Sequence, residues 1–475
     1  MKPEKIKLTA YSLPLLFFLC CTLLHAEELP VVKITATQLS EVFSDGTVQI
    51  GDGEAMAAEI RYRGASSLRY QKKSFAIKLK GEDGEKLDTS LLGMRSDNSW
   101  ILDAMTIDKA RMRNRVSTDL WLDFSSKLYY HDEHPKALNG TRGKFVEVVL
   151  NDEYHGLFCL TEKVDRKQLK LKKYDEDKVK GMLYKLVKFN SMWIDDESRY
   201  AWDNSKAVWD EGWEADYPDV TEGEPIDWSP LVSTIRWLNE ATDEELNELL
   251  SEKIDLPVWI DYFLLVDLML GDDNAAKNMY VSFRDLQSVP CRMTVTPWDM
   301  DATWGRSFKS EALSPTTATG LYNQIYARIL SLPNGIAGMF EPRYADLRST
   351  YFSAETLKEY FQRYFELFRS TGAAQHEQER WSGTDGITLN FEEEEQYIND
   401  WIDHRLSYLD KRYHYTVPSD IPATASSTPL PQPQDIFTAT GILIGKGTIN
   451  DLSLPPGIYI IGKKKYIVRR LRQEG

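Results

Sequence analysis

Hydrophobic and polar residues alternate in several short stretches before residue 190, and this alternation predicts β-strands. Within residues 57–80, the two kinds of residue alternate around Ile60 and again around Ile77. A period of two is the pattern of a strand with one buried face. Comparable patterns predict a strand at 31–35, two strands within 143–160 joined by a turn at Asn151 and Asp152, and a strand at 181–188.

Apolar residues recur at helical spacing in much of the later chain, which predicts α-helices. The first is expected at 109–125, and an acidic first turn marks another at 243–251. Further helices are expected at 230–238, 257–270, 321–332, 354–370 and 392–413. Strands followed by helices predict an α+β fold.

Residues 189–230 have no clear period and are rich in acids and tryptophan, which predicts an irregular insertion. Its tryptophans are Trp193, Trp202, Trp209, Trp213 and Trp228. Such aromatic residues hold a segment in place when they pack against the core. Exposed aromatic rings also stack on sugar rings, so a carbohydrate-binding surface is the alternative.

Carboxylates stand at the ends of predicted elements within residues 259–305. An apolar run that we expect to be helical ends just before Asp272 and Asp273, and a later strand-like run leads to Asp299 and Asp301. Carboxylate oxygens are hard ligands that suit Mg²⁺ or Mn²⁺. The stretch therefore predicts a site for a divalent metal ion.

Asp273 and Asn278 are separated by four residues, which is the spacing of Asp and Asn in a protein-kinase catalytic loop. In that loop the Asp orients the attacking hydroxyl and the Asn holds a metal ion. Asp273 is therefore the candidate catalytic residue, with Asn278 as a candidate metal ligand. Asp299 and Asp301 are the other candidate ligands. The plain alternative is a helix end and a turn, where Asp and Asn are common.

A loop of small residues between two predicted strands is the candidate phosphate site. It contains Arg63, Gly64, Ser66 and Ser67, whose backbone N–H groups and hydroxyls suit phosphate oxygens. Lys73 follows closely in the sequence. The alternative is an ordinary hairpin loop with a solvated basic edge.

Other charged residues are candidates for nucleotide binding. In kinases a strand lysine, held by a glutamate, contacts the nucleotide phosphates. Lys73 or Lys78 with Glu162 is the candidate pair in this chain. Arg113, early in the helix expected at 109–125, is a candidate phosphate contact, and a surface salt bridge is its default alternative.

The two ends of the chain differ from its middle. Residues 1–26 combine basic residues, a short apolar run and a terminal alanine, which predicts a secretory signal peptide. The apolar run is too short to span a bilayer, so we expect no membrane-spanning segment after cleavage. Residues 417–434 are rich in Pro, Ser and Thr, which predicts an extended linker. Alternation within 435–475 predicts a small β module.

Composition limits the class of protein. The formal net charge of −16 argues against non-specific binding to nucleic acid or to an anionic membrane. A chain of 475 residues with 42% hydrophobic residues has enough apolar surface for one or two cores. Beyond residue 26 its cysteines are Cys159 and Cys291, which excludes a disulfide scaffold.

Five sequence blocks, taken in order, resemble the spore-coat protein H (CotH) kinase family. They are R-Y-R-G-A-S-S with K-S-F-A-I-K-L, S-W-I-L-D-A with R-N, L-N-D-E-Y-H-G-L-F-C-L-T-E-K-V, D-D-N-A-A-K-N-M-Y-V, and P-W-D-M-D-A-T-W-G. The resemblance implies an atypical protein-kinase-like, two-lobed fold for 27–416, with ATP and Mg²⁺ or Mn²⁺ as cofactors. Its blocks contain the candidates Asp273, Asn278, Asp299, Asp301, Arg63, Gly64, Ser66, Ser67 and Arg113.

The segment G-I-Y-I-I-G-K-K near the C-terminus resembles the sorting domain of type IX secretion substrates, which implies export to the periplasm, the cell surface or the medium. The expected function is that of an exported atypical protein kinase that phosphorylates serines of surface or coat proteins. The rival hypothesis is a non-catalytic surface protein of the same fold that binds glycan or a protein partner.

Overall fold

The computed structural model describes most of residues 28–416 and a set of strands beyond them. Within that range the description omits 176–177, 190–191, 210, 220–222, 224, 320–323 and 333–336. The chain divides into two compact units, Met1–Tyr415 and Thr416–Gly475. The predicted signal peptide at 1–26 and nearly all of the predicted linker at 417–434 lie outside the described residues.

A closed β-barrel forms the N-terminal part of the first unit. Its strands, in barrel order, are β1 (Val31–Ala36), β2 (Ser44–Ile50), β3 (Met56–Arg63), β4 (Ser74–Lys80), β7 (Ser99–Asp103), β9 (Glu153–Glu162) and β8 (Gly143–Leu150). A short hairpin of β5 (Thr89–Ser90) and β6 (Ser96–Asp97) follows β4. The predicted alternation is confirmed in β4, where Phe75, Ile77 and Leu79 are buried and Lys78 is exposed. One face of each strand fills the barrel, which is why the sequence alternates there.

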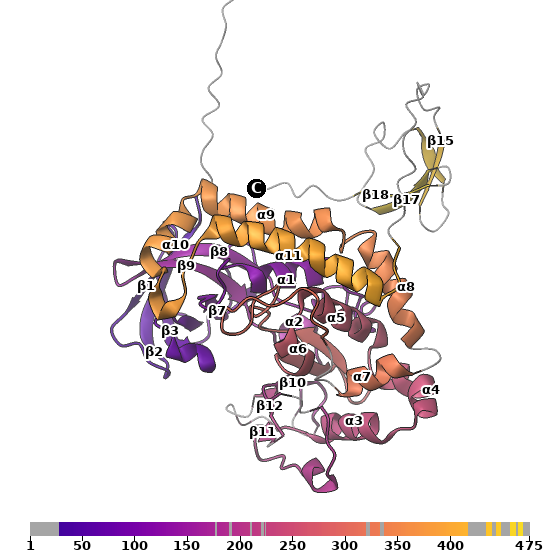
Figure 1. Ribbon diagram of the computed structural model, residues 1–475. Helices are drawn as coiled ribbons and strands as arrows, with labels where there is room; N and C mark the ends of the chain where they lie inside the picture. The colour runs from indigo at the N-terminus through magenta and orange to yellow at the C-terminus, as the bar shows by residue number, and fades with distance from the viewer. Residues whose placement is uncertain are drawn as a thin grey trace, which may run out of the picture. The chain divides into compact units, whose positions relative to one another are not determined.

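A second, antiparallel sheet lies beside the helices of the first unit (Figure 1). Its strands, in order, are β11 (Val208–Trp209), β12 (Trp213–Tyr217), β10 (Met182–Leu186), β13 (Met279–Phe283) and β14 (Thr294–Pro297). β13 and β14 are buried along their whole length. The sheet thus joins the strand predicted at 181–188 to the two strands that carry the candidate site residues.

The tryptophan-rich insertion is more regular than its sequence predicts. Short η2 (Glu197–Tyr200) precedes β11 and β12, and these two strands extend the second sheet. Trp209, Trp213 and Trp228 are buried, whereas Trp202 is 46% exposed. Packing is therefore the role of the buried rings, because their faces are covered by protein.

The predicted helices are largely confirmed, and the structure adds helices of 4 to 12 residues. The helices are α1 (Arg113–Phe124), α2 (Arg166–Leu169), α3 (Ser229–Glu240), α4 (Asp243–Lys253), α5 (Leu256–Met269), α6 (Asp272–Ala276), α7 (Gln324–Ser331), α8 (Ala337–Arg348), α9 (Ala354–Ser370), α10 (Ala373–Trp381) and α11 (Phe391–Arg412). α1 begins later than residue 109, because the Asp108 carboxylate accepts the N–H groups of Met112 and Arg113 and so starts the helix there. α4 begins with a capping box of Thr242 and Glu245.

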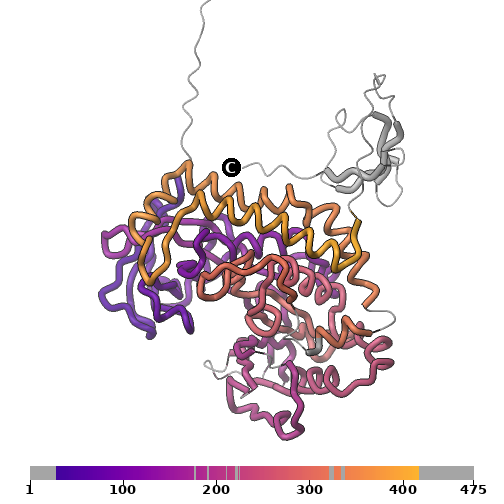
Figure 2. Tube along the Cα trace, in the orientation of Figure 1, coloured from indigo at the N-terminus to yellow at the C-terminus, as the bar shows by residue number. Residues whose placement is uncertain are grey.

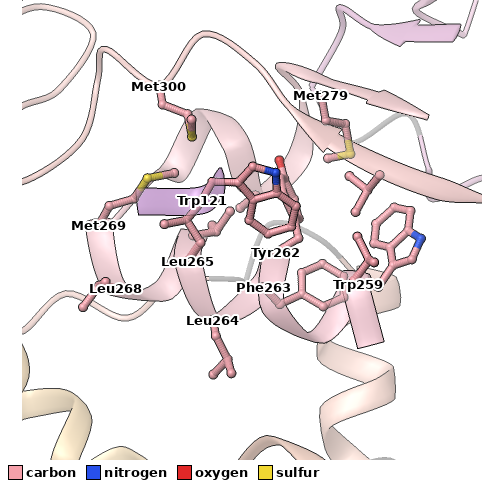
Figure 3. Close-up of a cluster of buried hydrophobic side chains, with 14 of the residues drawn as sticks. Trp121, Trp259, Tyr262, Phe263, Leu264, Leu265, Leu268, Met269, Met279 and Met300 are labelled. Atoms are coloured by element: carbon pink, nitrogen blue, oxygen red, sulfur yellow. The ribbon is translucent and has the colours of Figure 1, made fainter. Parts of the chain in front are cut away.

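The last three helices form a layer over the barrel and α1 (Figures 1 and 2). α9 packs against α1 and α11, and α10 packs against β9. Beneath them, α5 is largely apolar, and its residues from Val258 to Met269, including Asp261 and Asp267, are buried. Figure 3 shows the cluster around α5, in which Trp259, Tyr262, Phe263 and Met269 lie near Trp121 of α1. A helix that is hydrophobic all round must be covered on every face, so α5 is the central support of the site.

The second unit contains an antiparallel sheet in the order β16 (Leu443–Gly447), β15 (Gln434–Thr438), β17 (Gly457–Ile461) and β18 (Lys464–Val468). β16, β17 and β18 fall within the predicted β module at 435–475, and β15 begins one residue before it. Among the described residues, no helix has both the length and the apolar character needed to cross a membrane.

Candidate active site

Asp273 lies where α5 gives way to α6. α5 ends at Leu270 in the left-handed region (φ 50), and α6 starts after Gly271. The Asp273 carboxylate pairs with Lys277 at 3.1 Å. The alternative prediction of a helix end and a turn is therefore correct for the backbone. The turn also places Asp273 beside the ends of β13 and β14.

Sequence reasoning missed Asn274, a buried residue that ties α6 to both strands. Its Nδ2 donates to the carbonyl oxygens of Trp298 at 2.8 Å and Asn278 at 3.2 Å. Its own carbonyl oxygen accepts the hydroxyl of Tyr262 at 2.7 Å. Because Trp298 precedes Asp299, this network holds the Asp273 and Asp299 segments together.

Asn278 has a left-handed backbone at the junction of three strands. Its φ is 54, its N–H donates to Leu186 of β10, and its carbonyl oxygen accepts the N–H of Trp298 after β14. Its side chain is half-buried, and among the described residues none forms a hydrogen bond with its carboxamide. The backbone is therefore fully used in the fold, while the side chain remains available to a ligand.

Asp299 and Asp301 flank a buried methionine directly after β14. Met300 belongs to the same core cluster as Met269 and Trp121 (Figure 3). Asp299 has a φ of 57, a conformation that is uncommon for a residue other than glycine. With Met300 held in the core, the two carboxylates on either side of it remain accessible to solvent.

The acidic side chains of the site repel one another. Burial, and then Asp103, raises the pKa of Asp299, and Asp273 adds to the rise. Burial, and then Asp299, raises the pKa of Asp301 well above its ordinary range. Protein atoms crowd around Asp299, yet its side chain keeps contact with solvent, which screens part of this repulsion. The site therefore favours a bound cation.

Asp103 is a further carboxylate that sequence reasoning missed. It ends β7, and its Oδ2 accepts a hydrogen bond from Asn114 Nδ2 at 3.0 Å. Asn114 Oδ1 accepts the N–H of Met300 at 3.1 Å. Asn114 thus connects the barrel to the loop that carries Asp299 and Asp301. In the sequence, Asp103 is marked only by its place at the end of a strand, as Asp299 is after the last strand of the second sheet.

Arg63 and Lys185 form a cationic side of the same site. Arg63 Cζ lies 5.7 Å and Lys185 Nζ 5.9 Å from the ring centroid of Trp298. Both cations oppose the rise in the pKa of Asp299. Burial, and then Arg63, lowers the pKa of Lys185 itself. Sequence reasoning missed Lys185, because one lysine in a short predicted strand carries no local signal.

A cavity of about 40 Å³ lies where the barrel wall meets the end of β14. It is lined by Arg63, Ile101, Asp103, Asn114, Thr118, Thr141, Thr161, Pro297, Trp298 and Asp299. This volume holds a few water molecules or an ion, and it is smaller than a nucleotide. The cavity brings a cation, two carboxylates and three threonines from distant parts of the chain to one place.

The predicted phosphate loop follows directly from Arg63. Gly64 has a φ of 134, and a Cβ at this position would lie 2.0 Å from Ser67 Oγ, so a larger residue would strain the backbone and displace the Ser67 hydroxyl. η1 (Ser66–Arg69) begins in this loop, and the first N–H groups of such a turn have no partner within it. The N–H groups of Ser66 and Ser67 are these first donors of η1.

Lys73 does not extend toward the site. Its Nζ donates to the carbonyl oxygens of Leu68 at 2.5 Å and Tyr70 at 2.7 Å. The predicted phosphate contact is therefore corrected to a structural role, in which Lys73 closes the loop after Ser67.

The predicted pairing of Lys73 or Lys78 with Glu162 is wrong. Glu162 is buried and pairs with Arg142 at 2.8 Å. Lys78 lies on the outer surface of the barrel, with Nζ 4.7 Å from the ring centroid of Phe43. Glu162 and Lys78 stand on opposite faces of the barrel wall, because Glu162 is level with the inward-facing Trp100 and Ile77.

Arg113 is also a structural residue, which corrects its predicted phosphate contact. It is fully buried, and its guanidinium pairs with Asp108 and Glu394 at 2.6 Å each. It also donates to the carbonyl oxygen of Thr303 at 3.0 Å. A buried arginine with two carboxylate partners holds α1, the loop after Asp301 and α11 together, and it has no route to a nucleotide.

The side chains of Asn278, Asp299 and Asp301 fit a hard divalent cation. None of the described residues forms a hydrogen bond or an ion pair with their oxygens. Within the described residues no group of three or more His, Cys, Asp or Glu is arranged to hold a metal by itself. Mg²⁺ commonly takes one or two carboxylates together with substrate phosphates, and this set offers the protein's share of such a site.

Asp272 has a different environment from Asp273. Burial raises its pKa, an effect that Arg405 opposes and Asp273 increases. The neighbouring carboxylate thus adds repulsion at the start of α6.

A family model described as CotH kinase protein matches residues 60–409. A search of curated proteins finds no match. The matched range contains Asp273, Asn278, Asp299, Asp301 and the loop that follows Arg63. Since the match covers well over half of the 475 residues, the chain belongs to the CotH kinase family.

Proposed function

We propose that this protein is an exported atypical protein kinase that transfers the γ-phosphoryl group of ATP to serine hydroxyls of surface or coat proteins. Membership of the CotH kinase family supports a kinase-like activity. The observation that carries the proposal is geometric: Arg63 and Asp299 line one cavity, and Arg63 and Lys185 both lie beside Trp298, which directly precedes Asp299. Asp273 and Asp301 add negative charge close to Asp299. Phosphoryl transfer relies mainly on positioning and on charge neutralisation, and this arrangement supplies both.

In the proposed mechanism Asp273 accepts a hydrogen bond from the serine hydroxyl and takes its proton as the new P–O bond forms. The bond between the γ-phosphorus and the bridging oxygen breaks, and ADP leaves with that oxygen. Asn278 and Asp299 would hold the divalent cation, and Asp301 is its further candidate ligand. When bound, the cation neutralises charge on the phosphates. Arg63 and the N–H groups after Gly64 bind phosphate oxygens.

Titration of residues 27–475 with ATP, with and without Mg²⁺ or Mn²⁺, tests the nucleotide site. Transfer from γ-labelled ATP to serine-containing proteins then tests the reaction. Asp273→Asn should abolish transfer and keep metal-dependent ATP binding. The matched control is Asp403→Asn, which removes an exposed carboxylate paired with Lys358 on the helical layer. A folded protein that binds no nucleotide with either metal would refute the proposal.

Export rests on the predicted signal peptide at 1–26 and on the resemblance of 435–475 to a type IX sorting domain. Fractionation of cells that carry the full chain tests it, and retention in the cytoplasm would refute it. An exported protein can also meet glycans, so the alternative function is non-catalytic glycan binding through the insertion. That function would depend on exposed rings such as Trp202, since Trp209, Trp213 and Trp228 are buried.

A further inference from the structure

Lys185 projects from the middle of the second sheet. It lies on β10, opposite Glu214 of β12 and opposite Tyr280 of β13. Residues directly opposite across strands share a face of the sheet. The Tyr280 ring packs edge-on against Trp298, with 5.6 Å between centroids. The lysine therefore extends over the same face as Trp298, at the cationic side of the site.

We propose that Lys185, together with Arg63, binds the nucleotide phosphates, a role that the sequence had indicated for Lys73 or Lys78. This inference rests on the proposed function. Arg63, Trp298 and Asp299 line one cavity, and Arg63 and Lys185 both lie beside the Trp298 ring. Trp298 directly precedes Asp299. Phosphates bound to a metal at Asp299 would therefore lie next to the two cations.

The surroundings of Lys185 keep its ammonium group available. No described residue forms an ion pair or hydrogen bond with its Nζ. Of the acids near it, Asp216 is paired with Lys163 at 3.2 Å, and Glu214 is exposed. The aromatic rings of Tyr280 and Trp298, at 6.0 and 5.9 Å, limit access of water. Charged groups interact more strongly where water is excluded, which favours a phosphate ligand at this position.

The competing lysines lack this geometry. Lys73 is bound to two carbonyl oxygens of its own loop. Lys78 lies outside the barrel, over Phe43. Arg63, by contrast, shares Trp298 with Lys185, so the two cations approach one ligand from two different sheets.

Titration of the chain from residue 27 with MgATP and with adenosine separates a phosphate contact from a general effect on the site. Lys185→Met should weaken MgATP binding by about 10-fold or more, the usual effect of losing a charge-assisted hydrogen bond. Adenosine binding should be unchanged, and Lys185→Arg should restore part of the lost affinity. Lys33→Met, at an exposed position on β1, is the matched control.

Unchanged MgATP affinity in Lys185→Met would overturn the inference, as would an equal loss for MgATP and adenosine. Lys185→Gln keeps a polar end without the charge and replaces the methionine variant if that variant does not fold. If the wild type binds MgATP and the variants bind it equally well, the inference about Lys185 fails and the proposed function stands. If the wild type binds no MgATP, the proposed function fails and this inference fails with it.

Discussion

Asn114 donates a 3.0 Å hydrogen bond from Nδ2 to Oδ2 of Asp103. The same carboxamide accepts the N–H of Met300 through Oδ1 at 3.1 Å. One side chain of α1 thus fixes the end of β7 relative to the loop that carries Asp299 and Asp301. The acidic site depends on this bridge, because nothing local in either segment brings the two together.

Replacement of Asn114 by Ala should therefore affect both stability and ligand binding. The variant leaves the Met300 N–H without its acceptor and removes the Asn114 donor from Asp103 Oδ2, whereas Asp103 Oδ1 still accepts the N–H of Met105 at 3.0 Å. The loss costs about 1–3 kcal/mol of unfolding free energy. Metal-dependent ATP binding should weaken as well. Urea unfolding and titration check the two effects. Asn399→Ala, on α11, is the control, and equal behaviour of the two variants would contradict the bridging role.

Asp299→Asn should separate stability from function. Asp103 and Asp273 repel the Asp299 carboxylate and help to raise its pKa. Removing the charge relieves this repulsion, so the thermal midpoint should stay the same or rise. The variant also loses a hard charged ligand, so the dependence of ATP binding on Mg²⁺ should disappear. A variant that still requires Mg²⁺ for ATP binding would exclude Asp299 as a ligand.

Gly64→Ala should damage the phosphate loop. The new Cβ would lie 2.0 Å from Ser67 Oγ, and the φ of 134 is unfavourable for alanine. We expect ATP affinity to fall about 10-fold and unfolding free energy to fall by about 1–3 kcal/mol. Gly338→Ala, in α8 with open space around the new Cβ, should instead add up to about 1 kcal/mol. If both variants bind ATP normally, the loop makes no phosphate contact.

His155 makes the stability of the first unit sensitive to pH. Burial, and then Lys72, lowers its pKa to about 4. In the unfolded chain His155 binds a proton near pH 6.5, whereas in the folded chain it stays neutral down to about pH 4. The contribution of neutral His155 to the free energy of unfolding is therefore fully present above pH 6.5. It is lost as the pH falls from 6.5 toward 4, by about 1–3 kcal/mol.

Unfolding midpoints at pH 7 and pH 5 measure this contribution. His155→Phe should show a smaller loss than the wild type, because phenylalanine keeps the stacking on Phe158 and the edge contact with Trp381. His404→Phe, at an exposed position on α11, should retain the full dependence. Equal pH dependence in the wild type and His155→Phe would show that other groups are responsible.

Local patterns in the sequence were enough for much of the fold. α9 spans Ala354–Ser370 as predicted, since its apolar stripe is long and Ser353 caps its first turn. The turn at Asn151 and Asp152 joins β8 to β9 with φ values of 50 and 67, because these residues tolerate the left-handed region. The insertion was predicted less well, since β11 has two residues and is too short to show a period.

Local patterns in the sequence also predict part of the candidate site. Asp273, Asn278, Asp299 and Asp301 are the candidates that the sequence predicts by itself, because they stand a few residues apart at the ends of elements.

Tertiary structure decided which charged residues belong with them. Lys185 joins the site and Lys78 does not, because the barrel turns one strand lysine outward while the second sheet turns the other toward Trp298. Arg113 is buried between Asp108 and Glu394. Asp108 is five positions from Arg113, but Glu394 is 281 positions away. Lys185 and Trp298 are likewise more than a hundred positions apart, and no local spacing records such pairs.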